Sequence, residues 1–203
     1  MQTTTPILPT HVETRPPTRP LPFRAPARVQ TAWLSREQIP EFAERYSRAA
    51  GVLVSLDALL DSEIRGFFLQ GRPVAGYRLG RSATRYGAMA GDRVSDWPFD
   101  VDEAAEITHL WIAPDASSAV RRIVYGWILA DLLATHKTIV VGGSVSHDIT
   151  RQQMRSMPHL LHEVACPTVR PGGFATLYYG TVHTVVADAI ASGVPLPWLG
   201  GFR

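Results

Sequence analysis

Residues 106–114, EITHLWIAP, place a carboxylate and an imidazole in one apolar, β-branched segment. Such a segment predicts a strand, whose alternate side chains point to opposite faces. Glu106 and Thr108 would share one face, and His109 and Trp111 the other. Both Glu106 and His109 can accept a proton from a substrate, which makes them candidate catalytic residues. The alternatives are an ion pair for Glu106 and a hydrogen-bonded core position for His109.

A second polar run, SVSHD, follows residues 138–143, TIVVGG, which predict a buried parallel strand. Ser144, Ser146 and His147 would lie at the carboxyl end of that strand, where α/β sheets bind ligands. A Ser-His-Asp triad is the weaker interpretation, because sequence neighbours rarely converge and no Gly-x-Ser-x-Gly elbow is present. The structural alternative is a helix cap at Asp148 beside serines without a function.

Metal binding is not expected. His159 and His162 are three residues apart and could share a helix face, but no acidic or cysteine partner has a suitable spacing. The single cysteine, Cys166, excludes an internal disulfide and is expected to be a small buried hydrophobe rather than a nucleophile.

Composition indicates one soluble globular domain. The 203 residues are 45% hydrophobic and 19% charged, with a formal net charge of +2. Residues 1–28 are rich in Pro, Thr and Arg and predict a flexible tail, followed by a domain over 29–203. Nucleic-acid binding through the dispersed arginines is the weakest of the functions considered, because no stacking motif accompanies them. No apolar run is long enough to span a bilayer and no signal peptide is evident, so we expect a cytoplasmic protein.

The hydrophobic pattern predicts a mixed α/β sheet with helices on both faces, because a strand–helix–strand unit follows a hairpin. The expected elements are a strand at 29–34, helices at 35–50 and 56–64, a hairpin at 64–80, a loop at 81–104, a strand at 106–114, a buried helix at 117–137, a strand at 138–143, helices at 149–157 and 159–165, and a strand at 175–186.

The hairpin FFLQGRPVAGYRLG and the segment EITHLWIAPDASSAVRRIVYGWILADLLA resemble the second to fourth strands and the donor-binding helix of the GNAT acyltransferase superfamily. Within it, the chain is most similar to the branch of acyl-homoserine-lactone synthases and N-acyl amino acid synthases, because Glu106 opens the strand and a glycine-poor helix follows. The superfamily's pyrophosphate loop is degenerate here. Ser117, Val120 and Arg122 occupy the positions of its Gln/Arg, Gly and Gly/Ala.

The resemblance implies an N-acyltransferase that moves an acyl group from a pantetheine thioester to the amine of a small amino-acid-like metabolite. It places the donor in a sheet that opens beside Trp111. Of two tyrosines that would point to opposite faces, Tyr178 and Tyr179, it offers one as the acid for the leaving thiolate. The resulting candidate residues are Glu106, His109 and Tyr179 for catalysis, Trp111, Ile112, Ser117, Ser118, Arg121 and Arg122 for the donor, and Ser144, Ser146 and His147 for the substrate.

The missing loop glycines favour an acyl carrier protein over free coenzyme A as the donor. Glycine lets backbone amides approach a diphosphate, whereas the carrier's phosphopantetheine has a single phosphodiester. Arg121 and Arg122 could supply compensating charge. The same loss also favours the alternative function, a catalytically inactive GNAT-like module that binds a ligand or partner. A homodimer remains open.

Overall fold

The computed structural model describes residues 28–166 and 173–194, so nearly all of the predicted tail at 1–28 lies outside the described residues. Seven strands form one sheet in the order β1-β2-β3-β4-β5-β7-β6. The strands are β1 (Val29–Trp33), β2 (Glu63–Leu69), β3 (Arg72–Gly80), β4 (Ala104–Ile112), β5 (Ile139–Ser144), β6 (His159–Ala165) and β7 (Phe174–Thr181). The helices are α1 (Ile39–Ala50), α2 (Asp57–Leu60), α3 (Thr84–Ala90), α4 (Ser118–Ala134), α5 (His147–Gln153) and α6 (Val182–Ala191), with 3-10 turns at Arg36–Gln38, Gly91–Asp96 and Val101–Glu103.

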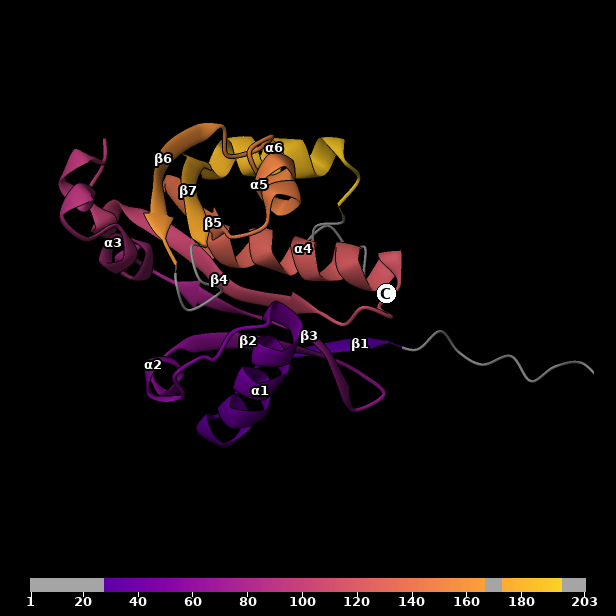
Figure 1. Ribbon diagram of the computed structural model, residues 1–203. Coiled ribbons are helices and arrows are strands. Elements are labelled where there is room, and N and C mark those ends of the chain that lie inside the picture. The colour runs from indigo at the N-terminus through magenta and orange to yellow at the C-terminus, as the bar shows by residue number, and fades with distance from the viewer. Residues whose placement is uncertain (1–27, 167–172, 195–203) are drawn as a thin grey trace, which may run out of the picture.

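The sheet is mixed, as predicted. Strands β4 and β5 pair in parallel, and every other neighbouring pair is antiparallel. Helix α4 is the crossover that parallel pairing requires. Helices α4, α5 and α6 lie on the opposite side of the sheet from α1 and α2 (Figure 1). Among the described residues, no helix has the length and apolarity that crossing a bilayer would need.

The helix predicted from Ser35 begins as a 3-10 turn at Arg36–Gln38 and continues as α1, which ends where its sequence predicts. Ser35 and Gln38 form a capping box, in which the Ser35 N–H donates to Gln38 Oε1 at 3.0 Å. Gly51 ends the helix in the left-handed conformation, with φ 68°. The buried face of α1, which includes Phe42, packs in a cluster with Trp111 of β4.

Two predicted elements were wrong, and a third was too long. The expected loop at 81–104 contains α3 and two 3-10 turns, which are too short to give a helical period. Residues 159–165 form the edge strand β6 rather than a helix, because they pair along their length with β7. The last predicted strand ends at Thr181, which caps α6.

A buried ion pair joins β2 to α4. Arg65 donates to both carboxylate oxygens of Asp131 at 2.6 Å, and the Tyr77 hydroxyl donates to the same carboxylate at 2.5 Å. The Arg65 guanidinium lies between the rings of Trp33 and Trp127, 4.0 and 4.5 Å from their centroids. This contact holds the long helix against the antiparallel half of the sheet.

Candidate functional site

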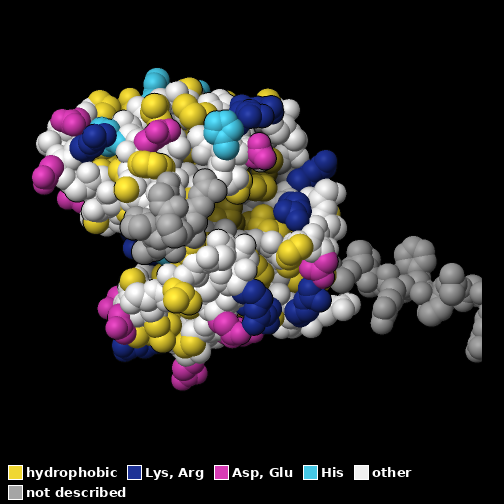
Figure 2. Space-filling view, in the orientation of Figure 1, with side chains coloured by type: hydrophobic (Ala, Val, Ile, Leu, Met, Phe, Trp, Pro, Cys, Tyr) yellow, Lys and Arg dark blue, Asp and Glu magenta, His cyan; other side chains and the backbone are white. Residues whose placement is uncertain are grey.

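The sheet opens between β4 and β5. Only Ala104–Glu106 pair with Ile139–Val141, although β4 continues to Ile112 and β5 to Ser144. Beyond Glu106, the edge of β4 that faces β5 has no ladder partner. The prediction that the strands separate beside Trp111 is confirmed. Figure 2 shows a hollow between the two halves of the molecule, with hydrophobic side chains in its floor and Lys or Arg at its rim.

A β-bulge interrupts β4 at His109. Arg78 opposes Thr108 and Gly76 opposes Trp111, so two residues of β4 face the single residue between them on β3. His109 has φ 51°, in the left-handed region that side chains other than glycine seldom adopt.

The bulge overturns the predicted assignment of faces. Ile107 and Leu110 pack in the cluster under α4, whereas His109 contacts Thr108 and stacks edge-on against Tyr46 of α1. Glu106, Thr108, His109 and Trp111 therefore all face α1 and α3.

Glu106 is fully buried at the last paired position of β4. Its Oε1 accepts from Arg78 Nη1 at 2.6 Å, and its Oε2 accepts from the Tyr86 backbone N–H at 3.2 Å. Gly80 gives it room, because a Cβ there would collide with the Glu106 side chain. Burial raises the pKa of Glu106 above its ordinary value, although the Arg78 and Tyr86 hydrogen bonds act to lower it.

His109 is held as a neutral ring in one tautomer. Its Nε2 lies 2.7 Å from Arg85 Nη1, and its Nδ1 lies 3.0 Å from Thr108 Oγ1. A guanidinium can only donate, so Nε2 accepts and the ring proton sits on Nδ1, which donates to Thr108. Burial and the charges of Arg85 and Arg78 lower the pKa of His109 to about 3. Its lone pair is thus engaged by Arg85 rather than presented to a substrate.

The two predicted tyrosines point to opposite faces, as expected. Tyr179 pairs with Val141, which pairs with Glu106, so it lies two strands from Glu106 on the same face. That spacing is roughly 10 Å. The Tyr179 ring packs against His159 and Phe99. Tyr178 lies on the other face, where its hydroxyl donates to Gln153.

Tyr86 is a site residue that the sequence did not indicate. Its hydroxyl donates to the backbone carbonyl of Ile107 at 3.4 Å. Ile107 is the first residue of β4 beyond the segment that pairs with β5. Its ring lies against Gly143 of β5, where a Cβ would approach within 2.7 Å. Burial raises the pKa of Tyr86, so the phenol stays protonated. It was missed because α3 lies in the segment predicted to be a loop.

An apolar cavity of about 240 Å³ lies on the α4 side of the opening. Ile107 of β4 and Val141 and Gly142 of β5 border it where the strands separate. Its walls come from α4, α5, α6 and the turn after α5, and include Ile128, Leu129, Met157, Val185 and Ala189.

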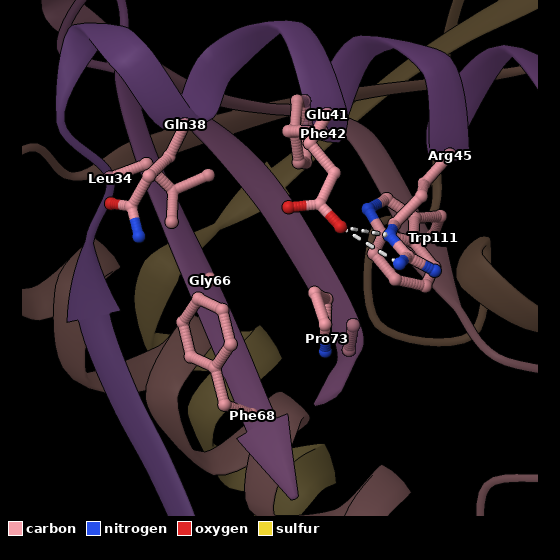
Figure 3. Close-up of a pocket in the computed structure, with 10 residues that line it drawn as sticks. Leu34, Gln38, Glu41, Phe42, Arg45, Gly66, Phe68, Pro73 and Trp111 are labelled. Atoms are coloured by element: carbon pink, nitrogen blue, oxygen red, sulfur yellow. Dashed lines mark hydrogen bonds and ion pairs between the residues drawn. The ribbon is translucent and has the colours of Figure 1, made fainter. Parts of the chain in front are cut away.

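A smaller groove lies on the other face, between α1 and the hairpin (Figure 3). Phe42, Phe68 and Trp111 contribute its apolar lining, and the Glu41–Arg45 ion pair closes one side. The indole N–H of Trp111 is buried without a hydrogen-bond partner.

The junction between β4 and α4 is capped by a serine side chain. Ser117 accepts from the Val120 N–H, and α4 begins at the exposed Ser118. The Arg121 guanidinium folds back onto the carbonyl oxygens of the preceding loop, at 3.3 to 3.4 Å. Arg122 is exposed. The structure thus brings the predicted donor residues of the loop together, while Ile112 packs in the cluster under α4.

The predicted substrate contacts at the end of β5 form a helix cap. Ser144 Oγ contacts the backbone of Ser146, and Ser146 caps α5, in place of the predicted Asp148. His147 is exposed, and no triad forms. His159 and His162 lie on a strand, and within the described residues no group of three or more His, Cys, Asp or Glu could hold a metal.

No family model and no curated protein matches the chain. Solved structures do match it. It is similar to FeeM, an N-acyl amino acid synthase from uncultured soil microbes, at 12% identity and a TM-score of 0.58, over 83% of this chain and 97% of that one. It is also similar to the AHL synthase LasI, at 8% identity and a TM-score of 0.59, over 84% and 98%. The putative acetyltransferase yncA from Salmonella typhimurium, solved with acetyl-CoA, matches at 12% identity and a TM-score of 0.51, over 76% and 94%.

These matches extend over most of each chain. The sequence identities are low, so the likeness concerns architecture. The chain has the GNAT fold, and structures of an N-acyl amino acid synthase and of an acyl-homoserine-lactone synthase share this architecture.

Proposed function

We propose that this protein is an N-acyltransferase that moves an acyl group from a pantetheine thioester to the amine of a small, amino-acid-like metabolite. The observation that carries the proposal is the opening of the sheet after Glu106. An unpaired strand edge presents N–H and C=O groups in a row. The amide groups of a pantetheine arm are the complementary partners for such an edge.

The donor would lie along β4 with its phosphate toward the start of α4. A helix N-terminus offers unpaired N–H groups and a partial positive charge. Here the Ser117 hydroxyl already accepts a hydrogen bond from one of these groups, the Val120 N–H, and Arg121 and Arg122 add positive charge. Such a junction suits one phosphodiester better than a diphosphate, which supports an acyl carrier protein as the donor.

The acyl chain would enter the cavity between α4 and α6, which opens where the thioester would sit. The cavity volume of about 240 Å³ is far larger than the ~10–15 Å³ that a cavity needs to hold one water. An acetyl group would leave most of this apolar space unfilled. The cavity therefore supports a donor with a chain of several carbons.

The reaction needs a proton acceptor and a proton donor. The amine nitrogen attacks the thioester carbonyl carbon, the carbon–sulfur bond breaks, and the thiolate takes a proton. We assign Glu106 as the base or amine anchor. Its carboxylate is fully covered, so the amine, or a water bound to it, must displace Arg78 or the Tyr86 N–H to reach it.

Two tyrosines on this face are candidates for protonating the thiolate. Tyr179, the candidate from the sequence, is held between two aromatic rings. Tyr86 presents its hydroxyl at the Ile107 carbonyl, where the opening begins. We favour Tyr86 for this position. His109 is assigned a positioning role, because Arg85 occupies its lone pair.

A second candidate function is a module with this fold that binds a ligand without transferring an acyl group. The complete burial of Glu106 and the absence of glycine at positions 117, 120 and 122 favour it.

One experiment separates the two functions. The purified protein is incubated with long-chain acyl-coenzyme A or acyl-loaded carrier protein and a panel of amines, and products are identified by mass spectrometry. An amide product, formed faster from the carrier-bound donor, supports the transferase. Donor binding without any amide product supports the module.

A further inference from the structure

The guanidinium of Arg85 has no acidic partner within the described part of the chain. Within the same part of the chain, it donates to the neutral ring of His109 at 2.7 Å. The other arginine of this face, Arg78, is neutralised by Glu106. Arg85 is half-buried, and it takes part in none of the ion pairs among the described residues. Among the described residues, one of its five N–H donors has a hydrogen-bond partner, so the guanidinium can donate further hydrogen bonds.

The position of Arg85 is fixed from both sides. His109 accepts from it through Nε2, and its protonated Nδ1 donates to the Thr108 hydroxyl, which holds the ring in place. The neighbouring Tyr86 is anchored through its backbone N–H to Glu106. The chain that follows α3 is held by Trp97, which is buried in the cluster beside β7. A guanidinium held in this way loses little freedom on binding a ligand.

Arg85 lies beside the proposed base but away from the proposed phosphate site. It contacts His109 in the middle of β4, whereas the phosphate would bind past the end of that strand, near Ser117. Arg78, Arg85 and the Glu106 carboxylate together carry one net positive charge. An anion on the acceptor, rather than the donor, would balance it.

We infer that Arg85 is a specificity-determining residue that binds a carboxylate on the acceptor, while the amine of the same molecule faces Glu106. A planar guanidinium matches the two oxygens of a carboxylate. The inference rests on the proposed function, and it narrows the acceptor class to amines that carry a free carboxylate.

The test compares proteinogenic L-amino acids with their carboxamides as acceptors, with one long-chain acyl donor throughout. The unmodified protein should acylate the acids 10- to 100-fold more efficiently than the amides, as expected for hydrogen bonds to a charged group. Arg85→Gln should remove this preference by lowering kcat/KM for the acids, while the amides and the KM for the donor change little. Arg85→Lys should recover part of it.

Arg81→Gln is the matched control, because Arg81 is exposed and pairs with Glu63 at the surface. Equal acylation of acids and amides by the unmodified protein would overturn the inference and leave the proposed function standing. An equal loss on both acceptor classes in Arg85→Gln would assign Arg85 a structural role instead. If no amine is acylated at all, the proposed function fails and the inference fails with it.

Discussion

Arg78 Nη1 lies 2.6 Å from Oε1 of Glu106, the last residue of β4 that pairs with β5. The ion pair of Glu106 with Arg78 thus sits where the sheet opens, on the face of α1 and α3. An ion pair that served stability alone would gain little from this position, since desolvation offsets most of the attraction between buried charges. A ligand that enters the opening would therefore meet the charges of Arg78 and Glu106.

Replacing Glu106 with Gln should reduce kcat/KM by ~10²-fold or more, because general base catalysis contributes about that much. The raised pKa of Glu106 predicts that the acidic limb of the pH profile of kcat/KM lies above the ordinary range of a glutamate. Activity should rise as pH passes this value, and the limb should disappear in Glu106→Gln. Glu63→Gln, at the exposed pair with Arg81, is the control. An unchanged rate in Glu106→Gln would remove the assigned role.

His109 should stay neutral throughout the physiological range. Its pKa is lowered from 6.5 to about 3, so the folded state binds a proton more weakly than the unfolded state. Its contribution to stability is complete above pH 6.5 and is lost as pH falls toward 3. The free energy of unfolding of the unmodified protein, minus that of His109→Asn, should fall by about 1.4 kcal/mol per pH unit below 6.5.

Asparagine suits this comparison because it tolerates a positive φ better than most residues. His183→Asn, at an exposed position of α6, is the matched control. Titration of the His109 ring between pH 6 and 7 in NMR spectra would contradict the assignment.

The ion pair of Arg65 and Asp131 should matter for stability. Asp131→Asn leaves a buried guanidinium without its counter-ion and should lower the free energy of unfolding by about 3–5 kcal/mol. Glu44→Gln removes the exposed partner of Arg48 and should change it by less than about 0.5 kcal/mol. Urea denaturation of the two variants measures the difference. Equal effects would show that the buried pair is no stronger than the surface pair.

Filling the cavity should change the preference for the acyl chain. Ala189 of α6 lines its wall, so Ala189→Phe should lower kcat/KM for long-chain donors by ~10-fold or more and spare acetyl donors, since the added ring takes up the space of the chain. Competition between donors of different length, followed by mass spectrometry, measures the ratio. Ala187→Phe, at an exposed position of the same helix, should leave the ratio unchanged. An equal loss of kcat/KM for acyl groups of every length would show that the acyl group binds outside this cavity.

Removing one tyrosine hydroxyl at a time should identify the proton donor. Tyr86→Phe removes the hydroxyl at the opening and should reduce kcat by ~10²-fold, the lower end of the effect of general acid catalysis. Tyr178→Phe, on the opposite face, should leave kcat nearly unchanged. Single-turnover rates with a saturating donor compare them. If Tyr179→Phe alone lowers the rate, the assignment reverts to that residue.

Much of the fold was predictable because its signals are local. The capping box at Ser35, the turn of the β2–β3 hairpin and the apolar helix after residue 117 each follow from a few neighbouring residues. The edge strand β6 was mistaken for a helix because its pairing with β7 is a tertiary contact, and His-Leu-Leu-His-Glu fits either period.

The site was less predictable than the fold. Glu106 was identified because a carboxylate in an apolar strand is unusual. The face of His109 was not, because one extra residue in a strand reverses the alternation and leaves no local pattern in the sequence. Arg85 and Tyr86 reach the site through α3, which is too short to have a period.

A crystal structure with a non-hydrolysable acyl-pantetheine analogue would test the central claim most directly. We predict that the arm lies between residues 107–112 of β4 and residues 142–144 of β5, with the acyl chain in the cavity beside Ile128 and Ala189. An analogue bound elsewhere, or strands that pair along this whole length with the analogue excluded, would contradict the account.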